Sequence, residues 1–239
     1  MTTNIIAKNI DHALIQIAHE IHDNGTIISP REHETKEILN AHITIQDPLD
    51  NIVTLPERNL STKYLEAELA WYESAETNIR RIQEHSSFWK TLADENNEVQ
   101  SNYGNHAHKQ KFYGKTQYEW CLDSLRKDNN TRQALINYNQ PTHKKPGTKD
   151  FVCTISQQFL LRDNALNSVV TMRSNDAVYG FCYDVPWFTQ LQTRISRELN
   201  VKIGEYHHFA ASMHIYKKHY DMIRRIRENY ERTGEKQCS

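Results

Sequence analysis

A cysteine, an arginine and two acids follow one another closely between residues 150 and 192. Cys153 stands twenty residues before Arg173, which opens the cluster Arg-Ser-Asn-Asp, and Asp184 follows this cluster. A thiolate is a strong nucleophile, and a nearby arginine favours the thiolate by lowering the thiol pKa. Arginine also binds phosphate, and a carboxyl group can pair with the polar edge of a base. These residue types predict covalent chemistry on a nucleotide.

Each of these residues also has an ordinary structural explanation. An isolated cysteine such as Cys153 often serves as a small buried hydrophobic side chain. Arg173 and Arg132, which could favour its thiolate, could instead form surface ion pairs. Asp184 stands two residues before a proline and could simply cap a helix there. However, Asp176 and Asp184 lie in the apolar stretch MRSNDAVYGFCYDVPW, where an unpaired charge is costly, so each acid needs a partner or a ligand.

Three further polar residues are candidates by position. Glu68 falls on a predicted helix beside Leu65 and Leu69, where a glutamate is usually exposed. His214 and Tyr216 alternate along a predicted strand and therefore point to the same face. They could donate hydrogen bonds to one ligand, or they could form a satisfied pair in the core.

The spacing of apolar residues and the residues that cap helices predict the helices and strands that position these side chains. Apolar residues recur at helical spacing from Ile10 to Ile21, and Ser61 or Thr62 could cap a second helix. We expect further helices over 117–127, from Pro186 onward and over 220–230. Strands are predicted over 36–46, 134–138, 151–161, 165–172 and 206–214, with an irregular segment over 96–111 and a loop over 140–149.

Composition limits the class of protein. The chain has 239 residues without a repeat or a linker, which predicts one α+β domain over residues 1–239. A net charge of −1 gives no support for duplex nucleic-acid binding, so an anionic ligand would need a local arginine cluster.

No apolar run reaches the roughly 18 residues of a membrane span, and the N-terminus lacks a signal-peptide pattern. Four cysteines without paired spacing predict reduced thiols and a cytoplasmic location, and no metal-ligand spacing is present.

Taken together, these residues resemble the thymidylate synthase superfamily over nearly the whole chain. AELAWYES places Glu68 where the family has its general-base glutamate. SFWKTLADENN and SNYG are similar to its tryptophan loop, with Trp89 at a folate-contacting position and Tyr103 near the nucleophile. The pair Cys-Thr, ahead of RSND, implies that Cys153 is the nucleophile. The resemblance implies a large mixed sheet flanked by helices and a homodimer formed through the sheets.

The same resemblance implies which residues bind the ligands. The 5′-phosphate would be bound by arginines and a serine, including one arginine from across the dimer interface, and the deoxyribose hydroxyl by a histidine and a tyrosine. The folate would be held by Trp89, Asp176 and Gly180. The implied nucleotide ligands are Arg31, Arg173, Ser174, Asn175, His214, Tyr216 and the partner subunit's Arg132.

Asp184 is the departure that indicates the base. Thymidylate synthases have an asparagine at this position, and its amide matches the N3–H donor and the O4 acceptor of uracil. Cytosine reverses both groups, and a carboxylic acid can accept from its 4-amino group and donate to N3. RSND followed by this acid is similar to the deoxycytidylate hydroxymethylases of bacteriophages.

Three other departures concern the tail and the phosphate site. The C-terminal residues ERTGEKQCS are charged, where thymidylate synthases have an apolar tail that shields hydride transfer. An intermediate open to water would be hydroxylated instead of reduced. Gln133 replaces a second phosphate arginine, and Thr154 replaces the histidine that usually follows the nucleophile.

The resemblance therefore implies a transferase that uses 5,10-methylenetetrahydrofolate and water to convert deoxycytidylate (dCMP) to 5-hydroxymethyl-dCMP. Cys153 would add to C6, Asp184 would support N3, and Glu68 would position the water. The alternatives are hydroxymethylation of deoxyuridylate (dUMP), thymidylate synthesis or dCMP methylation on the same scaffold, and a catalytically inactive protein that binds nucleotide or RNA. If the protein is encoded by a phage, its location would be the host cytoplasm.

Overall fold

The computed structural model describes residues 2–144 and 146–235 of the chain, which form a large sheet and seven α-helices. The helices are α1 (Ile10–Asn24), α2 (Thr62–Ser74), α3 (Phe88–Leu92), α4 (Tyr103–His108), α5 (Gln117–Lys127), α6 (Phe181–Leu199) and α7 (Tyr220–Glu235). The strands are β1 (Thr3–Ala7), β2 (Thr26–Ile28), β3 (Thr35–Ile45), β4 (Lys111–Phe112), β5 (Lys115–Thr116), β6 (Leu135–Asn137), β7 (Thr154–Arg162), β8 (Ala165–Met172), β9 (Asn175–Asp176) and β10 (Lys202–Tyr216).

The main sheet is mixed. Its strands follow the order β1-β3-β10-β8-β7-β6, while β2 pairs with β3 and β9 pairs with β10. β1 runs parallel to β3 and β8 runs parallel to β10, and the remaining neighbours along this order are antiparallel. The predicted α+β fold with one large mixed sheet is confirmed.

Local signals explain where the helices begin. The side chain of Asn9 caps α1, and the Ser61 side chain caps α2 by accepting from the backbone N–H of Tyr64. Thr116 and Glu119 form a reciprocal capping box at the start of α5. The predicted bounds of α5 and the predicted Ser61 cap are confirmed.

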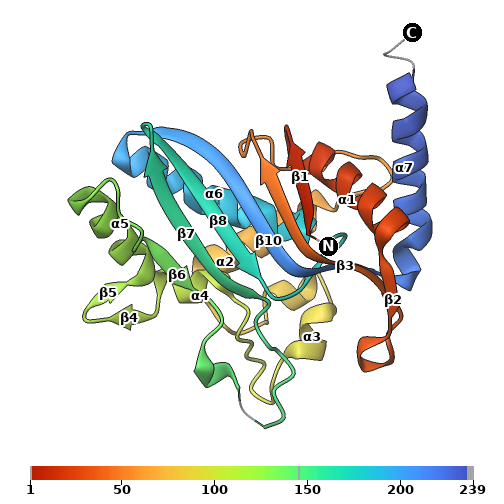
Figure 1. Ribbon diagram of the computed structural model, residues 1–239. Helices are drawn as coiled ribbons and strands as arrows, with labels where there is room; N and C mark the ends of the chain where they lie inside the picture. The colour runs from red at the N-terminus through yellow and green to blue at the C-terminus, as the bar shows by residue number, and fades with distance from the viewer. Residues whose placement is uncertain (1, 145, 236–239) are drawn as a thin grey trace.

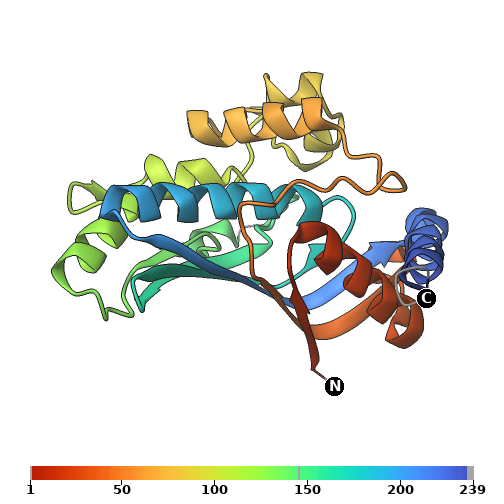
Figure 2. The same ribbon diagram turned by 90° about the horizontal axis from the view of Figure 1, so that it is seen from above.

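The helices cover one face of the sheet. Figure 1 shows α6 and α2 behind the strands, and Figure 2 shows α6 directly on the sheet with α2 in a further layer outside it. α1 lies on the same side near β1, and α7 packs alongside α1. Among the described residues, the opposite face of the strands carries no helix (Figure 2).

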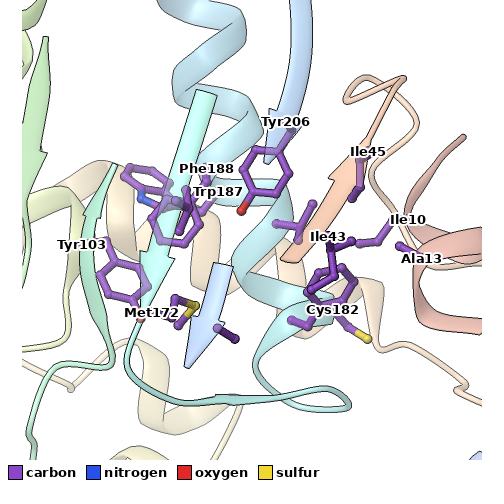
Figure 3. Close-up of a cluster of buried hydrophobic side chains, with 14 of the residues drawn as sticks. Ile10, Ala13, Ile43, Ile45, Tyr103, Met172, Cys182, Trp187, Phe188 and Tyr206 are labelled. Atoms are coloured by element: carbon purple, nitrogen blue, oxygen red, sulfur yellow. The ribbon is translucent and has the colours of Figure 1, made fainter. Parts of the chain in front are cut away.

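The core lies between the sheet and these helices. Figure 3 shows Trp187 and Phe188 of α6 close to Tyr206 of β10, and Ile10 of α1 close to Ile43 of β3. All five of these side chains are fully buried. Because α6 is held against β8 and β10 by this packing, its first turn has a fixed position relative to the strand ends.

Four sequence predictions need correction. The segment 96–111 contains the buried helix α4, because Asn102 and Asn105 donate to backbone carbonyls at the end of α2 instead of to water. The strand predicted over 151–161 begins only at Thr154, and α6 begins at residue 181 and not at Pro186. The adjacent apolar residues Val169 and Val170 predict a strand buried on both faces, but Val169 is only half-buried, so this prediction is wrong for β8. None of the described helices could cross a membrane.

Candidate active site

The predicted nucleophile and the predicted phosphate arginine are neighbours. Cys153 lies immediately before β7, and Arg173 lies immediately after β8, its antiparallel partner. The Arg173 backbone N–H donates to the Cys153 carbonyl at 3.0 Å, and Arg173 Nη2 lies 3.4 Å from Cys153 Sγ. Arg173 Nε also donates to the Val152 carbonyl at 3.2 Å, which fixes the guanidinium beside the thiol.

Burial controls the ionisation of this thiol. It raises the pKa of Cys153, and the positive charges of Arg173 and Arg31 oppose it only in part. The arginines therefore lower the thiol pKa as expected, but burial outweighs them, so the expectation of a lowered net pKa is wrong. The Cys153 side chain is therefore mainly a neutral thiol, and a thiol must lose its proton before it can act as a nucleophile.

Asp184 faces the interior from the first turn of α6. Gly180 occupies the N-cap position of this helix, so Asp184 is not the cap. Its side chain is 9% exposed, and Oδ2 accepts a hydrogen bond of 2.8 Å from Asn175 Nδ2. Burial raises the pKa of Asp184 to about 7, against the opposing effect of the Asn175 hydrogen bond. A carboxyl group in this state is available as an acid or as a base near neutral pH.

Glu68 is buried as well, at 5% exposure, which contradicts the exposed position that is usual for a helix glutamate. Its Oε1 accepts a hydrogen bond of 2.6 Å from the Tyr64 hydroxyl. The Tyr64 hydroxyl oxygen in turn accepts a hydrogen bond of 3.0 Å from Trp89 Nε1. Burial raises the pKa of Glu68 to about 8, although the Tyr64 hydrogen bond lowers it, and the Asp184 charge raises it further. Two acids with raised pKa values therefore influence each other at this site.

Aromatic rings enclose the same region. The Tyr103 ring lies 5.2 Å from the rings of Tyr72 and Phe188 and 5.3 Å from that of Tyr138. Burial raises the pKa of Tyr103 well above its ordinary value, so its hydroxyl stays neutral. Tyr103 is brought within electrostatic influence of Cys153 and Asp184, as the resemblance implied.

The residues predicted to hold folate belong to the turn before α6 and to α3. Asp176 Oδ1 accepts from the backbone N–H of Val178 at 2.7 Å, which orders this turn. A Cβ at Gly180 would lie 2.5 Å from Asn175 Nδ2, so the glycine makes room for the amide that holds Asp184. Trp89 is 4% exposed and packs against Trp71 at 4.7 Å between ring centroids.

His214 and Tyr216 lie together on β10. Their ring centroids are 5.5 Å apart, and His214 Nδ1 is buried without a hydrogen-bond partner among the described residues. A buried nitrogen without a partner can form a hydrogen bond with the hydroxyl group of a ligand. Ser174 is half-buried beside Arg173. Arg31 is exposed and has the left-handed φ of 50°, and its charge reaches both Cys153 and Tyr216.

Arg132 is the predicted site residue that the fold does not bring to the nucleophile. It is exposed at the edge of the sheet before β6, and its carbonyl accepts from Gln158 Nε2 at 2.8 Å. At about 3.3 Å per residue, Gln158 lies roughly 16 Å along β7 from Cys153.

Two residues near the acids were missed by the sequence reasoning. Tyr64 precedes Glu68 by one helical turn, and this i,i+4 spacing was a usable signal. His208 contacts Asn175 across the sheet, and that pairing has no local signal.

The surface also has two hollows away from these residues, of about 360 Å³ beside α1 and α7 and about 480 Å³ between α2 and α6. Neither is lined by a residue that was predicted to act.

Comparisons with known proteins agree with this geometry. A sequence model described as thymidylate synthase matches residues 12–237. The deoxycytidylate 5-hydroxymethyltransferase of Enterobacteria phage T4 is 31% identical over 75% of this chain and 76% of its own length. The deoxyuridylate hydroxymethyltransferase of Bacillus phage SP01 is 23% identical over 80% of this chain and 53% of its own length.

Among solved structures, thermostable thymidylate synthase A from Bacillus subtilis has a TM-score of 0.75 at 18% identity, and the match covers 92% of this chain and 84% of that one. Members of the matched family are one-carbon transferases that act on pyrimidine nucleotides with methylenetetrahydrofolate as co-substrate. The chain described here belongs to the thymidylate synthase family.

Proposed function

We propose that the protein is a dCMP 5-hydroxymethyltransferase that uses 5,10-methylenetetrahydrofolate and water. The observation that carries this proposal is the buried carboxyl group of Asp184, whose pKa of about 7 allows the protonated form at neutral pH. The protonated acid donates to N3 of cytosine while its other oxygen accepts from the 4-amino group. The relatives that match over most of their length at 31% identity are named for this reaction on dCMP.

The nucleophile would work together with the arginine beside it. Cys153 Sγ adds to C6 of the base, and Arg173 Nη2, which lies 3.4 Å from the sulfur, stabilises the developing thiolate. As C6 is attacked, negative charge develops on the ring, and the proton that Asp184 shares with N3 disperses this charge. C5 thereby becomes nucleophilic and would bond to the one-carbon unit supplied by the folate. Loss of the C5 proton to water and departure of tetrahydrofolate would then leave a methylene group on C5.

The residues present suit that folate. One carboxylate oxygen of Asp176 accepts from the backbone, and the other oxygen can accept from the amino and N–H donors of a pterin. Trp89, which is buried, and Tyr64, which is half-buried, form an aromatic wall beside the acids. We propose that Asp176, Gly180 and Trp89 hold this co-substrate.

Glu68 would control the water that completes the reaction. With a pKa of about 8, its carboxyl group can exchange a proton with a bound water near neutral pH, and the Tyr64 hydroxyl fixes one of its oxygens. This water would add to the methylene carbon attached to C5, and Cys153 would then leave C6. The product is 5-hydroxymethyl-dCMP, and if the protein is encoded by a phage, this modified nucleotide would be made in the host cytoplasm for phage DNA.

We further propose that two copies pair through the uncovered face of the sheet. Apolar side chains on several strands are exposed, among them Ile6 at 60%, Leu39 at 54% and Ile155 at 41%. An apolar face of this kind marks an interaction surface. Pairing would also give Arg132 a function, since it lies too far along the sheet to reach the phosphate beside its own Cys153, and the partner subunit's Arg132 could serve that phosphate.

The test is a paired assay of dCMP and dUMP in the wild type and in Asp184→Asn. The proposal predicts turnover of dCMP by the wild type and a shift toward dUMP in the variant, because an amide matches uracil. A wild type that prefers dUMP would favour the related dUMP reaction, and an unchanged preference in the variant would remove Asp184 from base recognition.

The inactive-binder alternative is tested by release of tritium from C5 of the nucleotide. Release that depends on Cys153 supports an enzyme, because the proton at C5 leaves only after C6 has been attacked. Absence of release with either nucleotide would contradict every enzymatic alternative.

A further inference from the structure

A line of buried side chains leads from Asp184 into the sheet. Asn175 Nδ2 donates to Asp184 Oδ2 at 2.8 Å, and Asn175 Oδ1 lies 3.1 Å from His208 Nε2. His208 Nδ1 lies 2.9 Å from the Tyr206 hydroxyl. His208 and Tyr206 have no exposed surface, and Asn175 is 3% exposed. Each member therefore depends on its neighbours, and not on solvent, for its hydrogen bonds.

The fold fixes the members of this line in place. Tyr206 and His208 alternate on the buried face of β10, and β9 pairs with the same strand further along, which brings Asn175 alongside. Phe181 packs its edge on the His208 ring at 5.2 Å between centroids. Because Gly180 has no Cβ, the Asn175 amide can approach Asp184.

The hydrogen bonds have a defined direction. Burial lowers the pKa of His208 to about 3, so its ring is neutral and has one donor and one acceptor nitrogen. When the Tyr206 hydroxyl donates to Nδ1, Nε2–H donates to Asn175 Oδ1, and the Asn175 amide donates to Asp184.

The reverse direction would leave the Tyr206 proton without an acceptor among the described residues, and an unmet buried donor is costly. The arrangement therefore makes Asp184 Oδ2 an acceptor, and the proton of the acid resides on Oδ1.

This direction matters because a carboxylic acid alone does not distinguish the two bases. With its proton on the oxygen facing N3, the acid pairs with cytosine, whose N3 accepts and whose amino group donates. With its proton on the oxygen facing the 4-substituent, the acid pairs equally well with uracil, whose N3–H donates and whose O4 accepts. A residue that fixes the proton on one oxygen of Asp184 therefore determines whether cytosine or uracil binds.

We propose that His208 is a positioning residue that sets base specificity: acting through Asn175, it keeps Asp184 Oδ2 an acceptor facing the 4-amino group and so excludes uracil. This inference rests on the proposed function, because it explains how that function selects dCMP. Tyr206 acts one step further away, by fixing which nitrogen of His208 carries the proton.

The direct test compares kcat/KM for dCMP and for dUMP in His208→Phe and in His208→Gln. The phenylalanine removes the donor to Asn175, and we expect the preference for dCMP over dUMP to fall about tenfold or more. The glutamine amide can donate from a position close to Nε2, and this variant should keep most of the preference. His106→Phe removes a buried histidine of another network and should leave the ratio unchanged.

Two further measurements, a double variant and an NMR spectrum, distinguish a positioning role from a general loss of structure. In an Asp184→Asn background, His208→Phe should no longer alter the base ratio, since the acid that it directs is absent. A loss of kcat for both bases with the ratio intact would overturn the proposal.

Ring-nitrogen NMR of the wild-type histidines tests the direction without any activity. The proton of His208 should be on Nε2, and a proton on Nδ1 would overturn the inference. A wild type that turns over neither base would instead contradict the proposed function, and the NMR result would still decide the direction of the line.

Discussion

At the scale of single residues, the site contains two buried acids whose pKa values lie near neutral pH. Asp184 has a pKa of about 7 and Glu68 one of about 8, and burial is the main cause of both shifts. Their neighbours differ, because Asn175 donates to Asp184 and the Tyr64 hydroxyl donates to Glu68. In the proposed reaction Asp184 acts on the base and Glu68 acts on water.

The raised pKa of Asp184 predicts a dependence of stability on pH. Asp184 has an ordinary pKa of 3.8 when unfolded, so between about pH 4 and 7 only the folded protein binds this proton. The contribution of Asp184 to stability therefore falls as the pH rises through this window and levels off above about pH 7.

Asp184→Asn removes this pH-dependent loss of stability, and its advantage in free energy of unfolding should grow across the window by about 4 kcal/mol. Urea unfolding at several pH values measures this difference. Asp221→Asn, at an exposed acid, is the control, and a pH-independent advantage for Asp184→Asn would contradict the assignment.

Glu68→Gln tests the role of the second acid. The amide cannot exchange a proton with water, so kcat for hydroxymethylation should fall by about a hundredfold while the dissociation constant of dCMP changes little. Steady-state rates and calorimetric titration measure the two quantities. Glu66→Gln changes an exposed glutamate of the same helix and should keep normal turnover. Normal turnover in Glu68→Gln would remove it from the reaction.

At the scale of elements, the segment before α4 is attached to the segment before β7. Asp150 Oδ2 accepts from the backbone N–H of Gln100 at 2.6 Å and from that of Ser101 at 2.7 Å, and Oδ1 accepts from the Ser101 hydroxyl. This acid is buried and lies close in sequence to Cys153, while Ser101 lies close to Tyr103. The attachment therefore sets the position of Cys153 relative to Tyr103 and the rings that pack around it.

Asp150→Asn should weaken this attachment. An amide presents only one acceptor oxygen and no charge, so we expect a loss of about 2 kcal/mol in the free energy of unfolding, together with a lower kcat. Denaturant unfolding and steady-state kinetics measure both effects. Asp163→Asn, in the exposed turn between β7 and β8, is the control. An Asp150→Asn protein with wild-type stability would show that the attachment is dispensable.

Elements with local signals could be predicted from the sequence, and elements with long-range causes could not. The start of α5 follows from the capping box of Thr116 and Glu119, which lie only three residues apart in the chain. The start of α6 was placed too late because Pro186 suits a first turn. In the structure it lies inside the helix, where burial of the surrounding residues compensates for the lost backbone hydrogen bond.

The same distinction applies to the site. Cys153 and Arg173 could be paired from spacing because a tight turn joins their strands, β7 and β8. The raised pKa of Cys153 and the contact of His208 with Asn175 could not be predicted, since both depend on packing between distant segments. Cys238 and the last residues of the charged tail belong to the segment 236–239, which lies outside the described part of the chain.

At the scale of the whole molecule, the proposed pairing of two copies through the uncovered sheet face gives Arg132 its role in the partner's site. Subunit mixing tests this role. Cys153→Ala and Arg132→Ala should each be nearly inactive, because one lacks the nucleophile and the other lacks the arginine that completes the partner's phosphate site. A mixed dimer contains one site with both residues intact, so activity should return when the two proteins are unfolded and refolded together.

Two controls complete this experiment. Each variant refolded alone should stay inactive, and sedimentation should show dimers in every sample. Failure of the mixed dimers to recover activity would contradict the exchange of Arg132 between subunits.

The central claim is that water, and not hydride, completes the reaction on dCMP. Its most direct test is the mass of the nucleotide formed from dCMP and methylenetetrahydrofolate in water enriched in heavy oxygen. We predict a product heavier than dCMP by CH2O that carries the label in its new hydroxyl group, without the absorbance increase of dihydrofolate. An unlabelled methyl product with dihydrofolate formation would contradict the account.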